Sequence, residues 1–386
     1  MSKLDELIAE LCPNGVECKK LSEVSDMQRG TSLTKAKAIT GNIPVISGGK
    51  EPAFYCDSSN RDGETITVAG SGAGAGYVQY WNIPIFANDC FTLKGNEFVE
   101  TKYLYYFMTN IQEKISDTKK GGGVPHVHIS DVENFKLPVP PLPVQREIVR
   151  ILDNFTELTA ELTAELTARK KQYEYYRDEL LTFGGDIRSE KLKSVAKISR
   201  GVRVTKSQLS DSGYPVYQNA LAPMGYHSDY NVSGGTTYVI SAGAAGEIGF
   251  SDEDFWAADD CLFFTELNGV NNKYIYHFLM TKKDFIKSRV RKASIPRLSR
   301  EVIENLLMPI PSIELQNRIV DTLDNFEKIC TDLNIGLPAE INLRKKQYEF
   351  YRNCLLTFAE TGDTILTDRQ TDRQTDRQTD RQTDKQ

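Results

Sequence analysis

Apolar residues recur at helical spacing through the middle of the chain, between Pro143 and Gly184. The series consists of Ile148, Leu152, Phe155, Leu158, Leu162, Leu166, Tyr173, Tyr176 and Leu180. Residues three or four positions apart share one face of an α-helix. No glycine or proline interrupts the series after Pro143, and Gly184-Gly185 follows it. The pattern therefore predicts one long helix over residues 143–183.

A second stretch of the same kind runs from about Ile313 to Phe358, but it contains Gly336 and Pro338. Proline inside a helix removes a backbone donor and collides with the preceding turn, so this stretch is predicted to form two helices. Each apolar stripe is narrow and needs a partner. An antiparallel coiled-coil pair of the two long segments would bury both stripes. The alternative is that each segment packs only on the module next to it in the chain.

Two stretches of mixed pattern, 21–140 and 192–311, precede the long helical segments. The segments TITVAGSGAGAGYVQYW and TTYVISAGAAGEIGF are typical of strands around glycine-rich turns. KYLYYFMTNI and KYIYHFLMTK are typical of short helices, and each stretch ends in a proline-rich exit, KLPVPPLP or LMPIPS. Each module is therefore expected to mix helices and strands.

The chain is a tandem duplication. Residues 169–183 and 344–358 are identical at 12 of 15 positions, and LDNF at 152–155 returns at 323–326, an offset of 171. Read back without a gap to Leu21, that offset pairs Arg29-Gly30 with Arg200-Gly201. Between residues 91 and 130 only seven identities remain. A retained frame with two diverged modules predicts two readers of different targets. The stub LDELIAEL (4–11) resembles the helix ends and is expected to complete the second repeat's bundle.

Composition and charge limit the class of protein. The 386 residues suggest two or three domains, and no apolar run approaches the ~18 residues of a membrane span. The N-terminus lacks the features of a secretory signal, and seven cysteines without regular spacing suggest a reduced, cytoplasmic protein. Because the net charge is −6, any nucleic-acid role must depend on local basic surface.

Two motifs invite a cofactor or metal interpretation. The Gly70, Gly72, Gly74 and Gly76 series superficially suggests a dinucleotide or S-adenosylmethionine loop, but a strand-like segment follows, which favours tight β-turns. His126 and His128 lack accompanying ligands, and the second copy has Arg297 and Ser299 there, so no metal is expected. Donors for phosphates or base edges fit both copies better; an ordinary surface loop is the alternative.

The corresponding stretch of the second copy, FIKSRVRKASIPRLSR (285–300), carries six basic residues and no acid. Such a local patch is typical of a surface that binds a phosphate backbone, and a solvated charged loop is the alternative. No catalytic motif is evident, so the chain is interpreted as a binder without catalytic residues. The candidate DNA-binding residues are Arg29, Lys35, Lys119, Lys120, His126, His128, Arg200, Lys206, Arg289, Arg291, Lys292 and Arg297.

The duplicated modules, the exits KLPVPPLPVQREIVRILDNF and MPIPSIELQNRIVDTLDNF, the TAEL units and the repeated RKKQY segments are similar to the specificity (S) subunits of type I restriction-modification systems. The resemblance covers residues 1–358. It implies two target recognition domains that each read one half of a bipartite double-stranded DNA site. It also implies conserved helices that set the spacer and dock two methyltransferase subunits, with restriction subunits joining that core. S-adenosylmethionine, ATP and Mg²⁺ would then belong to the partners, with no cofactor in this chain.

The expected fold is α+β, with two mixed α/β target recognition domains joined by two long antiparallel helices that form a coiled-coil spacer, as a pseudo-two-fold tandem repeat. The expected divisions are a helical stub at 1–20, recognition domains at 21–142 and 186–312, a spacer helix at 143–185, a helical region at 313–360 and a disordered tail at 361–386. Partner docking is expected on exposed helix faces around Arg169–Arg177 and Arg344–Arg352.

The spacer helix carries Leu158, Leu162 and Leu166 in the segment TEL-TAEL-TAEL, which has a period of four residues. One unit adds about 6 Å and a net rotation of about 40° to a helix. One DNA base pair advances about 3.4 Å and about 35°. The match predicts that one unit corresponds to one base pair of spacer.

Residues 367–386 are TDRQ four times and then TDKQ, a polar and charge-balanced tail expected to be disordered. The codons ACA-GAC-AGA-CAG would encode this unit as one repeated tetranucleotide, which suggests a phase-variable tract; a low-complexity extension is the alternative. Two further functions stay open for the chain. They are a self-sufficient modification enzyme that binds S-adenosylmethionine in its glycine loop, and a helical adaptor without a DNA role.

Overall fold

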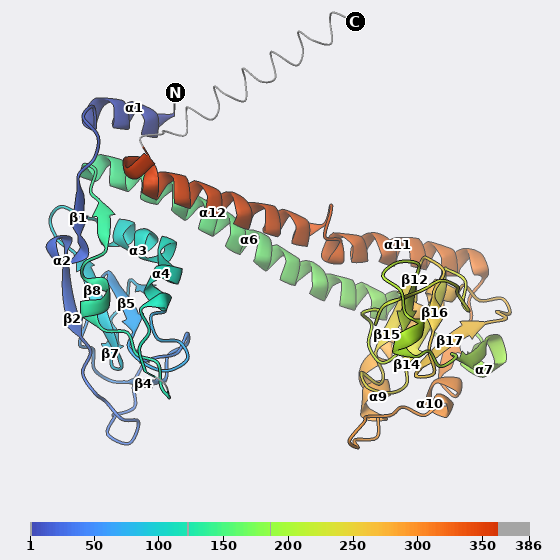
Figure 1. Ribbon diagram of the computed structural model, residues 1–386. Helices are drawn as coiled ribbons and strands as arrows, with labels where there is room; N and C mark the ends of the chain where they lie inside the picture. The colour runs from blue at the N-terminus through green and yellow to red at the C-terminus, as the bar shows by residue number, and fades with distance from the viewer. Residues whose placement is uncertain (1, 122, 186, 362–386) are drawn as a thin grey trace, which may run out of the picture. The chain divides into compact units, whose positions relative to one another are not determined.

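The computed structural model describes residues 2–121, 123–185 and 187–361. The tail at 361–386, for which disorder is predicted, lies outside the described residues except for Thr361, the last residue of a helix. The chain forms two compact units (Figure 1). Unit 1 comprises the residues up to Glu161 and those from Asn342 onward, and unit 2 comprises Leu162–Ile341. Each unit therefore combines one module with helix segments from both repeats.

The first module mixes short helices with three small sheets. Its elements are β1 (Cys18–Lys20), α2 (Leu21–Val24), β2 (Ser25–Arg29), β3 (Ile43–Ile46), β4 (Phe54–Cys56), β5 (Thr65–Ala69), β6 (Val78–Trp81), β7 (Phe86–Ala87), β8 (Cys90–Gly95), α3 (Thr101–Asn110), α4 (Gln112–Asp117), α5 (Ile129–Val132) and β9 (Lys136–Pro138). The main sheet is antiparallel with the order β2-β8-β5-β6, and β4-β3-β7 and β1-β9 form the others.

The second module repeats this order. Its elements are β10 (Ser189–Lys191), α7 (Leu192–Val195), β11 (Lys197–Arg200), the 3₁₀ helix η1 (Lys206–Gln208), β12 (Tyr214–Tyr217), β13 (Tyr226–His227), β14 (Thr236–Ile240), β15 (Ile248–Ser251), β16 (Trp256–Ala257), β17 (Cys261–Thr265), α8 (Asn272–Thr281), α9 (Lys283–Ser288), α10 (Arg300–Glu304) and β18 (Leu307–Pro309). Its sheets, β11-β17-β14-β15, β13-β12-β16 and β10-β18, match those of the first module strand for strand. The predicted strands around glycine turns and the short helices at 101–110 and 272–281 are confirmed.

The sequence alone aligns the two repeats at a constant offset of 171 residues. In one stretch this alignment is wrong. Ile46 pairs with Ala87 in the first module, and Tyr217, its counterpart at the offset of 171, pairs with Ala257. The offset at Ala87 is therefore 170. It returns to 171 at Asp89, whose carbonyl accepts from Gly70 just as that of Asp260 accepts from Ser241. The second copy has one residue fewer in its glycine turn and one more before β17, and backbone pairing reveals both.

Three long helices connect and flank the modules. They are α6 (Leu142–Leu180), α11 (Ile313–Thr331) and α12 (Leu337–Thr361). The single helix and the break near Gly336 and Pro338 are as predicted. Pro338 lies in the first turn of α12, where its missing N–H needs no helical partner. Among the described residues, no helix combines the length and the apolar character that crossing a membrane requires.

In unit 1 the first half of α6 pairs with the end of α12. Ile148 and Leu152 of α6 share one core with Leu355 and Leu356 of α12. Figure 1 shows the start of α6 beside the end of α12, so the pair is antiparallel. The N-terminal helix α1 (Lys3–Leu11) adds Leu4 to the same core. The stub therefore packs with the last helix of the second repeat inside unit 1.

In unit 2 the second half of α6 pairs with α11. Tyr173 and Leu180 of α6 pack against a core that contains Ile319, Val320 and Leu323 of α11. Each module core thus includes helical residues of the other repeat. The alternative in which each long segment packs only on its neighbouring module is therefore wrong.

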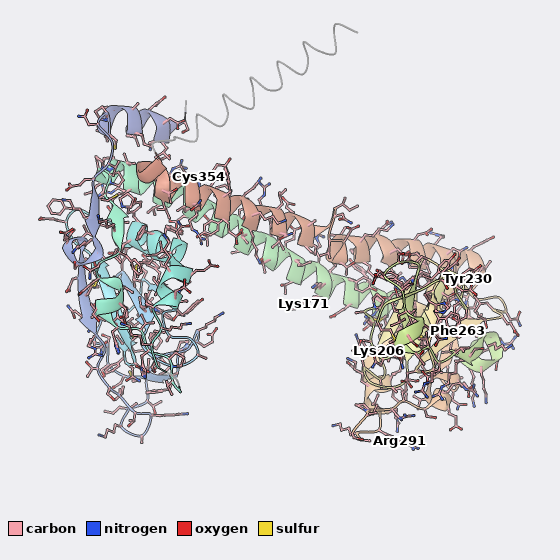
Figure 2. All side chains as sticks on the ribbon, in the orientation of Figure 1. Lys171, Lys206, Tyr230, Phe263, Arg291 and Cys354 are labelled. Carbon is pink, nitrogen blue, oxygen red and sulfur yellow. The ribbon has the colours of Figure 1, made fainter. Side chains whose placement is uncertain are left out.

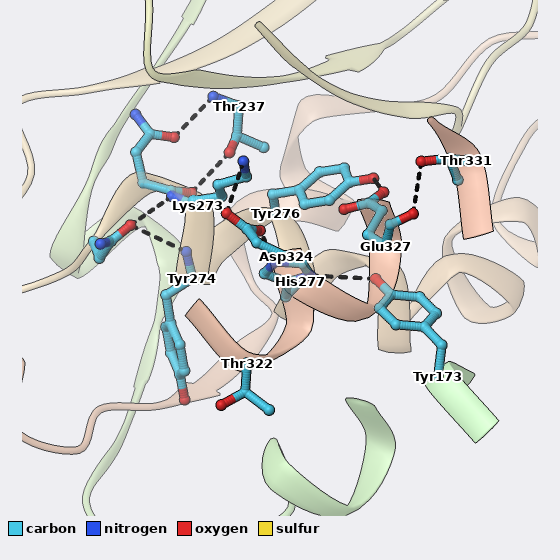
Figure 3. A network of polar contacts seen from close by, with 12 residues as sticks. Tyr173, Thr237, Lys273, Tyr274, Tyr276, His277, Thr322, Asp324, Glu327 and Thr331 are labelled. Carbon is cyan, nitrogen blue, oxygen red and sulfur yellow. Dashed lines mark hydrogen bonds and ion pairs between the residues drawn. The ribbon is translucent and has the colours of Figure 1, made fainter. Parts of the chain in front are cut away.

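Equivalent polar networks attach each module to its helices. The Asp153 carboxylate of α6 pairs with Lys102 at 2.8 Å and accepts from the Tyr106 hydroxyl. In unit 2 the Asp324 carboxylate of α11 pairs with Lys273 at 2.9 Å and with the buried His277 at 2.9 Å (Figure 3). Both modules are thus attached to their helices through an equivalent aspartate, and His277 takes the place of Tyr106 in the second module.

A buried glutamine completes each attachment. The Gln145 amide nitrogen donates to the carbonyls of Phe98 and Pro140, and its oxygen accepts from the Glu100 amide at 3.0 Å. Gln316 makes the three equivalent bonds in unit 2. Because an unsatisfied buried amide is costly, these bonds specify one position of each module on its helix.

Candidate nucleic-acid interface

Each module carries a short hairpin between its last two helices. Lys120 and His126 exchange two backbone hydrogen bonds of 3.0 and 2.8 Å between α4 and α5. Arg291 and Arg297 exchange bonds of 2.9 and 3.2 Å between α9 and α10. We call residues 119–121 and 123–128 the first hairpin and residues 290–299 the second hairpin. The two basic stretches noted in the sequence thus form the same two-stranded structure, one in each module.

The hairpins pack along the glycine turns. The Gly72 amide donates to the Pro125 carbonyl at 3.0 Å, and the Gly243 amide donates to the Pro296 carbonyl at 3.1 Å. Both glycines have φ near +80°, a region that glycine adopts without strain. The turn leads into strand β6 and not into a helix. A glycine turn that supports a hairpin fits poorly with the cofactor-loop interpretation, which requires a following helix.

Each hairpin forms one wall of a cavity. The first cavity has a volume of about 480 Å³ and lies between the end of β2, the start of β8 and the first hairpin. It is lined by Arg29, Gly30, Ser32, Gly70, Asn88, Asp89, Cys90, Phe91, His126, Val127, His128 and Ile129. The second cavity, about 340 Å³, is lined by Arg200, Ser241, Leu262, Leu298, Ser299 and Arg300. The two cavities occupy the same place in the two modules.

The cavity linings combine shared and differing positions. Arg29 and Arg200 are equivalent and exposed, so both cavities carry one guanidinium at the end of the edge strand. His128 is replaced by Ser299 and Ile129 by Arg300. A retained cation beside variable donors is the arrangement expected where phosphate contacts position a protein and other side chains select bases.

The structure brings most of the sequence-derived candidates together. Arg29, His126 and His128 line the first cavity and Arg200 lines the second, while Lys120, Arg291 and Arg297 form the hairpin pairs. Lys119, Arg289 and Lys292 are exposed beside these pairs. Lys35, in the turn after Thr34, and Lys206, at the start of η1, are exposed but do not line either described cavity.

An acidic residue missed from the sequence modifies the first hairpin. The Lys120 ammonium pairs with the Asp131 carboxylate, whose side chain is only 5% exposed. That hydrogen bond, helped by the His128 amide, lowers the pKa of Asp131 below its ordinary value. Asp131 lies 11 residues from Lys120, and no local pattern marked the pair. Part of the positive charge of the first hairpin is therefore compensated.

The second hairpin keeps more of its charge. Lys287 pairs with Glu247 at 2.7 Å and Arg300 with Glu304 at 2.9 Å. Within the described part of the chain, Arg289, Arg291, Lys292 and Arg297 form no ion pair. Figure 2 shows Arg291 at the end of its module opposite α11. Four unpaired cations close together form a surface suited to a phosphate backbone.

The histidines of the first hairpin lie face to face, with ring centroids 6.0 Å apart and planes inclined by 10°. In the described residues, the group with metal-ligand spacing is instead His277, Asp324 and Glu327. These side chains already bond within the protein, since His277 pairs with Asp324 and contacts the Tyr173 hydroxyl, while Glu327 accepts from Tyr276 at 2.8 Å (Figure 3). This cluster is a hydrogen-bonded network that joins the module to its helices.

Each of the two modules carries a hairpin with basic residues beside a cavity that an arginine lines, an arrangement suited to a nucleic-acid-binding protein. The family described as "Type I restriction modification DNA specificity domain" matches residues 13–169 and 186–343. The chain belongs to this family, and its role is sequence-specific DNA recognition. The earlier resemblance is confirmed, as are the two recognition domains and the helices between them.

Similar proteins span the whole architecture. A putative type I restriction enzyme specificity subunit of Haemophilus influenzae is 29% identical over 385 residues, which cover 89% of this chain and 96% of the relative. A specificity subunit of an Escherichia coli type I restriction enzyme is 29% identical over 422 residues, covering 93% and 97%. The crystal structure of an S subunit from M. genitalium superposes with a TM-score of 0.62 at 20% identity, covering 90% of this chain and 96% of that one. The last comparison supports the fold alone.

Proposed function

We propose that this chain is the non-catalytic DNA-reading subunit of a type I restriction-modification complex, with each module reading one half of a bipartite site. The observation that carries the proposal is the equivalence of the two hairpins and cavities. Both are built by the same backbone bonds, yet their side chains differ. A DNA site with two different halves requires two recognition modules with the same backbone and different side chains.

Arg29 and Arg200 would hold phosphates, because a guanidinium retained at equivalent places carries no information about differing sequences. Lys119, Arg289 and Lys292 would do the same at the hairpins, and Lys35 and Lys206 remain candidates for outlying phosphate contacts. His126, His128 and Arg297 would approach base edges, since their donors differ between the modules and lie beside the cavities.

The long helices would set the spacer and dock two methyltransferase subunits. Tyr175 and Phe350 are repeat-equivalent and are 63% and 55% exposed on α6 and α12. They lie within the segments expected to dock partners, 169–177 and 344–352. Two equivalent aromatic and basic surfaces suit two copies of one partner, because equivalent surfaces present the same contacts. Restriction subunits would join that core.

S-adenosylmethionine, ATP and Mg²⁺ would bind to the partner subunits and not to this chain. The glycine turn fits a hairpin support better than a cofactor loop. This weighs against the alternative of a self-sufficient modification enzyme, whose candidate cofactor site is the same turn. The test is cofactor binding by the isolated chain, in which saturable binding of S-adenosylmethionine would restore that alternative.

The main experiment is the mapping of methylated bases in cells that express this chain with its cognate methyltransferase subunit. A split motif of two short halves with a fixed gap is expected. Substitutions in the first cavity should alter one half only, and substitutions in the second cavity should alter the other. No motif, despite a stably assembled complex, would contradict the proposal and favour the helical adaptor.

A further inference from the structure

Each hairpin exposes one aliphatic side chain at its tip. Val124 is 54% exposed in the first hairpin and Ile295 is 53% exposed in the second. The two residues are equivalent, since each precedes the proline whose carbonyl accepts from the glycine turn. Val124 follows three glycines in the chain, and Ile295 follows Lys292-Ala293-Ser294; a proline comes directly after each of them. An apolar side chain thus occupies the same place in both modules.

The coincidence is notable in such diverged segments. Only seven identities remain between residues 91 and 130 and their counterparts, and Pro125 with Pro296 is one of them. Single exposed aliphatic residues are common on protein surfaces. A β-branched residue at the tip of both ribbons, beside residues that differ in charge and shape, requires a further explanation. A shared apolar target provides one.

The ribbon geometry indicates where that target lies. The DNA major groove is wide enough for a two-stranded ribbon, and base edges there present donors, acceptors and one apolar group, the 5-methyl of thymine. We propose, building on the DNA-reading function above, that Val124 and Ile295 contact a pyrimidine 5-methyl group in the half-site of their module. The neighbouring His126 and Arg297 then lie in position for polar base contacts.

The proposal makes a prediction about individual thymines. The assembled complex of this chain with its methyltransferase subunit would be titrated with duplexes in which each half-site thymine is replaced, one at a time, by uracil. At one thymine per half-site the loss of the methyl should weaken binding about fourfold, as expected for one buried methyl group. Val124→Ala should abolish this discrimination in the first half-site only, and Ile295→Ala in the second only.

Two variants provide controls. Ile83→Ala removes a side chain of similar exposure, 50%, from the β6–β7 turn and should leave thymine discrimination intact. Val124→Thr keeps the shape of valine but replaces one of its methyl groups with a hydroxyl, and it should weaken the preference without unfolding the module.

The outcomes separate this inference from the function beneath it. A wild-type complex that binds its bipartite site but does not distinguish thymine from uracil would overturn the methyl contact and leave DNA reading intact. A half-site made only of G·C pairs would do the same for its module. Undiminished discrimination in Val124→Ala would overturn it as well. A complex that binds no DNA at all would contradict both.

Discussion

Phe155 stacks on Tyr351 with ring centroids 5.3 Å apart, and the repeat-equivalent pair Phe326 and Tyr176 stacks at 5.7 Å. Phe155 lies on α6 after the first module, and Tyr351 lies on α12, the last helix of the second repeat. Phe326 lies on α11 after the second module, and Tyr176 lies near the end of α6. The duplication therefore does not build two separate bodies in chain order. Each unit is completed by residues from both copies, as the two cores also show.

The two rings of each pair should be energetically coupled, so that removing both costs less stability than the sum of the two single removals. The single variants Phe155→Ala and Tyr351→Ala and the double variant define a cycle whose coupling energy should be about 0.5–1.5 kcal/mol. Urea unfolding provides the free energies. Phe155→Ala combined with Ile83→Ala should be additive, and a coupling near zero for the ring pair would contradict a specific contact.

Asp324→Asn should destabilise unit 2 by about 1–3 kcal/mol near neutral pH, because it leaves Lys273 without its carboxylate. Burial opposes the charged form of Asp324, but hydrogen bonds from His277 and Lys273 outweigh it and hold its pKa below the ordinary value.

The sign of the pH effect follows from this lowered pKa. The contribution of Asp324 is fully present above its unfolded pKa and is lost as the pH falls through the folded pKa. The difference in unfolding free energy between wild type and Asp324→Asn should therefore shrink as the pH falls below about 5, through the unfolded pKa of about 3.9 and on through the lower folded pKa. Asp321→Asn, on an exposed turn of α11, serves as the control, and a constant difference would contradict the assignment.

Asp131→Asn should strengthen DNA binding. The substitution keeps an acceptor for the His128 amide but removes the charge that pairs with Lys120. If the released ammonium contacts a phosphate, the slope of log affinity against log salt should steepen by about 0.9. Binding would be measured over a salt series with specific and random duplexes. An unchanged slope would mean that Lys120 does not meet the backbone.

Removal of Arg289, Arg291 and Lys292 together should weaken binding to specific and random DNA alike. If all three side chains contact phosphates, the salt slope should fall by about 3. A control with Arg188, Lys193 and Lys197 replaced by alanine removes the same charge elsewhere in the second module. Equal losses in both triple variants would indicate a diffuse charge effect, and no loss would favour the adaptor.

Deletion of Thr163–Leu166 should shorten the recognised spacer by one base pair. The deletion removes one four-residue unit from the uninterrupted helix α6, about 6 Å and a net rotation of about 40°. Insertion of one further TAEL unit should lengthen the spacer by one base pair. Mapping of the methylated motif measures both, and an unchanged gap would rule out the helix as a ruler.

Much of the architecture could be predicted from local patterns. Helical spacing over 143–183, the proline break at Pro338 and the strand and turn signals depend on near neighbours in the chain, and the structure has the corresponding elements. The duplication was visible because the helical frame retained its side chains. The basic residues of both hairpins were likewise evident from their clustering.

Tertiary structure alone decided which segments meet. Apolar stripes specify that a helix needs a partner but not which one, so the pairing of α6 with α12 in unit 1 and with α11 in unit 2 had to be observed. The ion pair of Lys120 with Asp131 and the cavities behind the hairpins depend on the path of the backbone. The local offset of 170 could not be seen in the sequence because the side chains of that stretch have diverged. The backbone hydrogen bonds do not depend on side-chain identity, and they show which residues are equivalent.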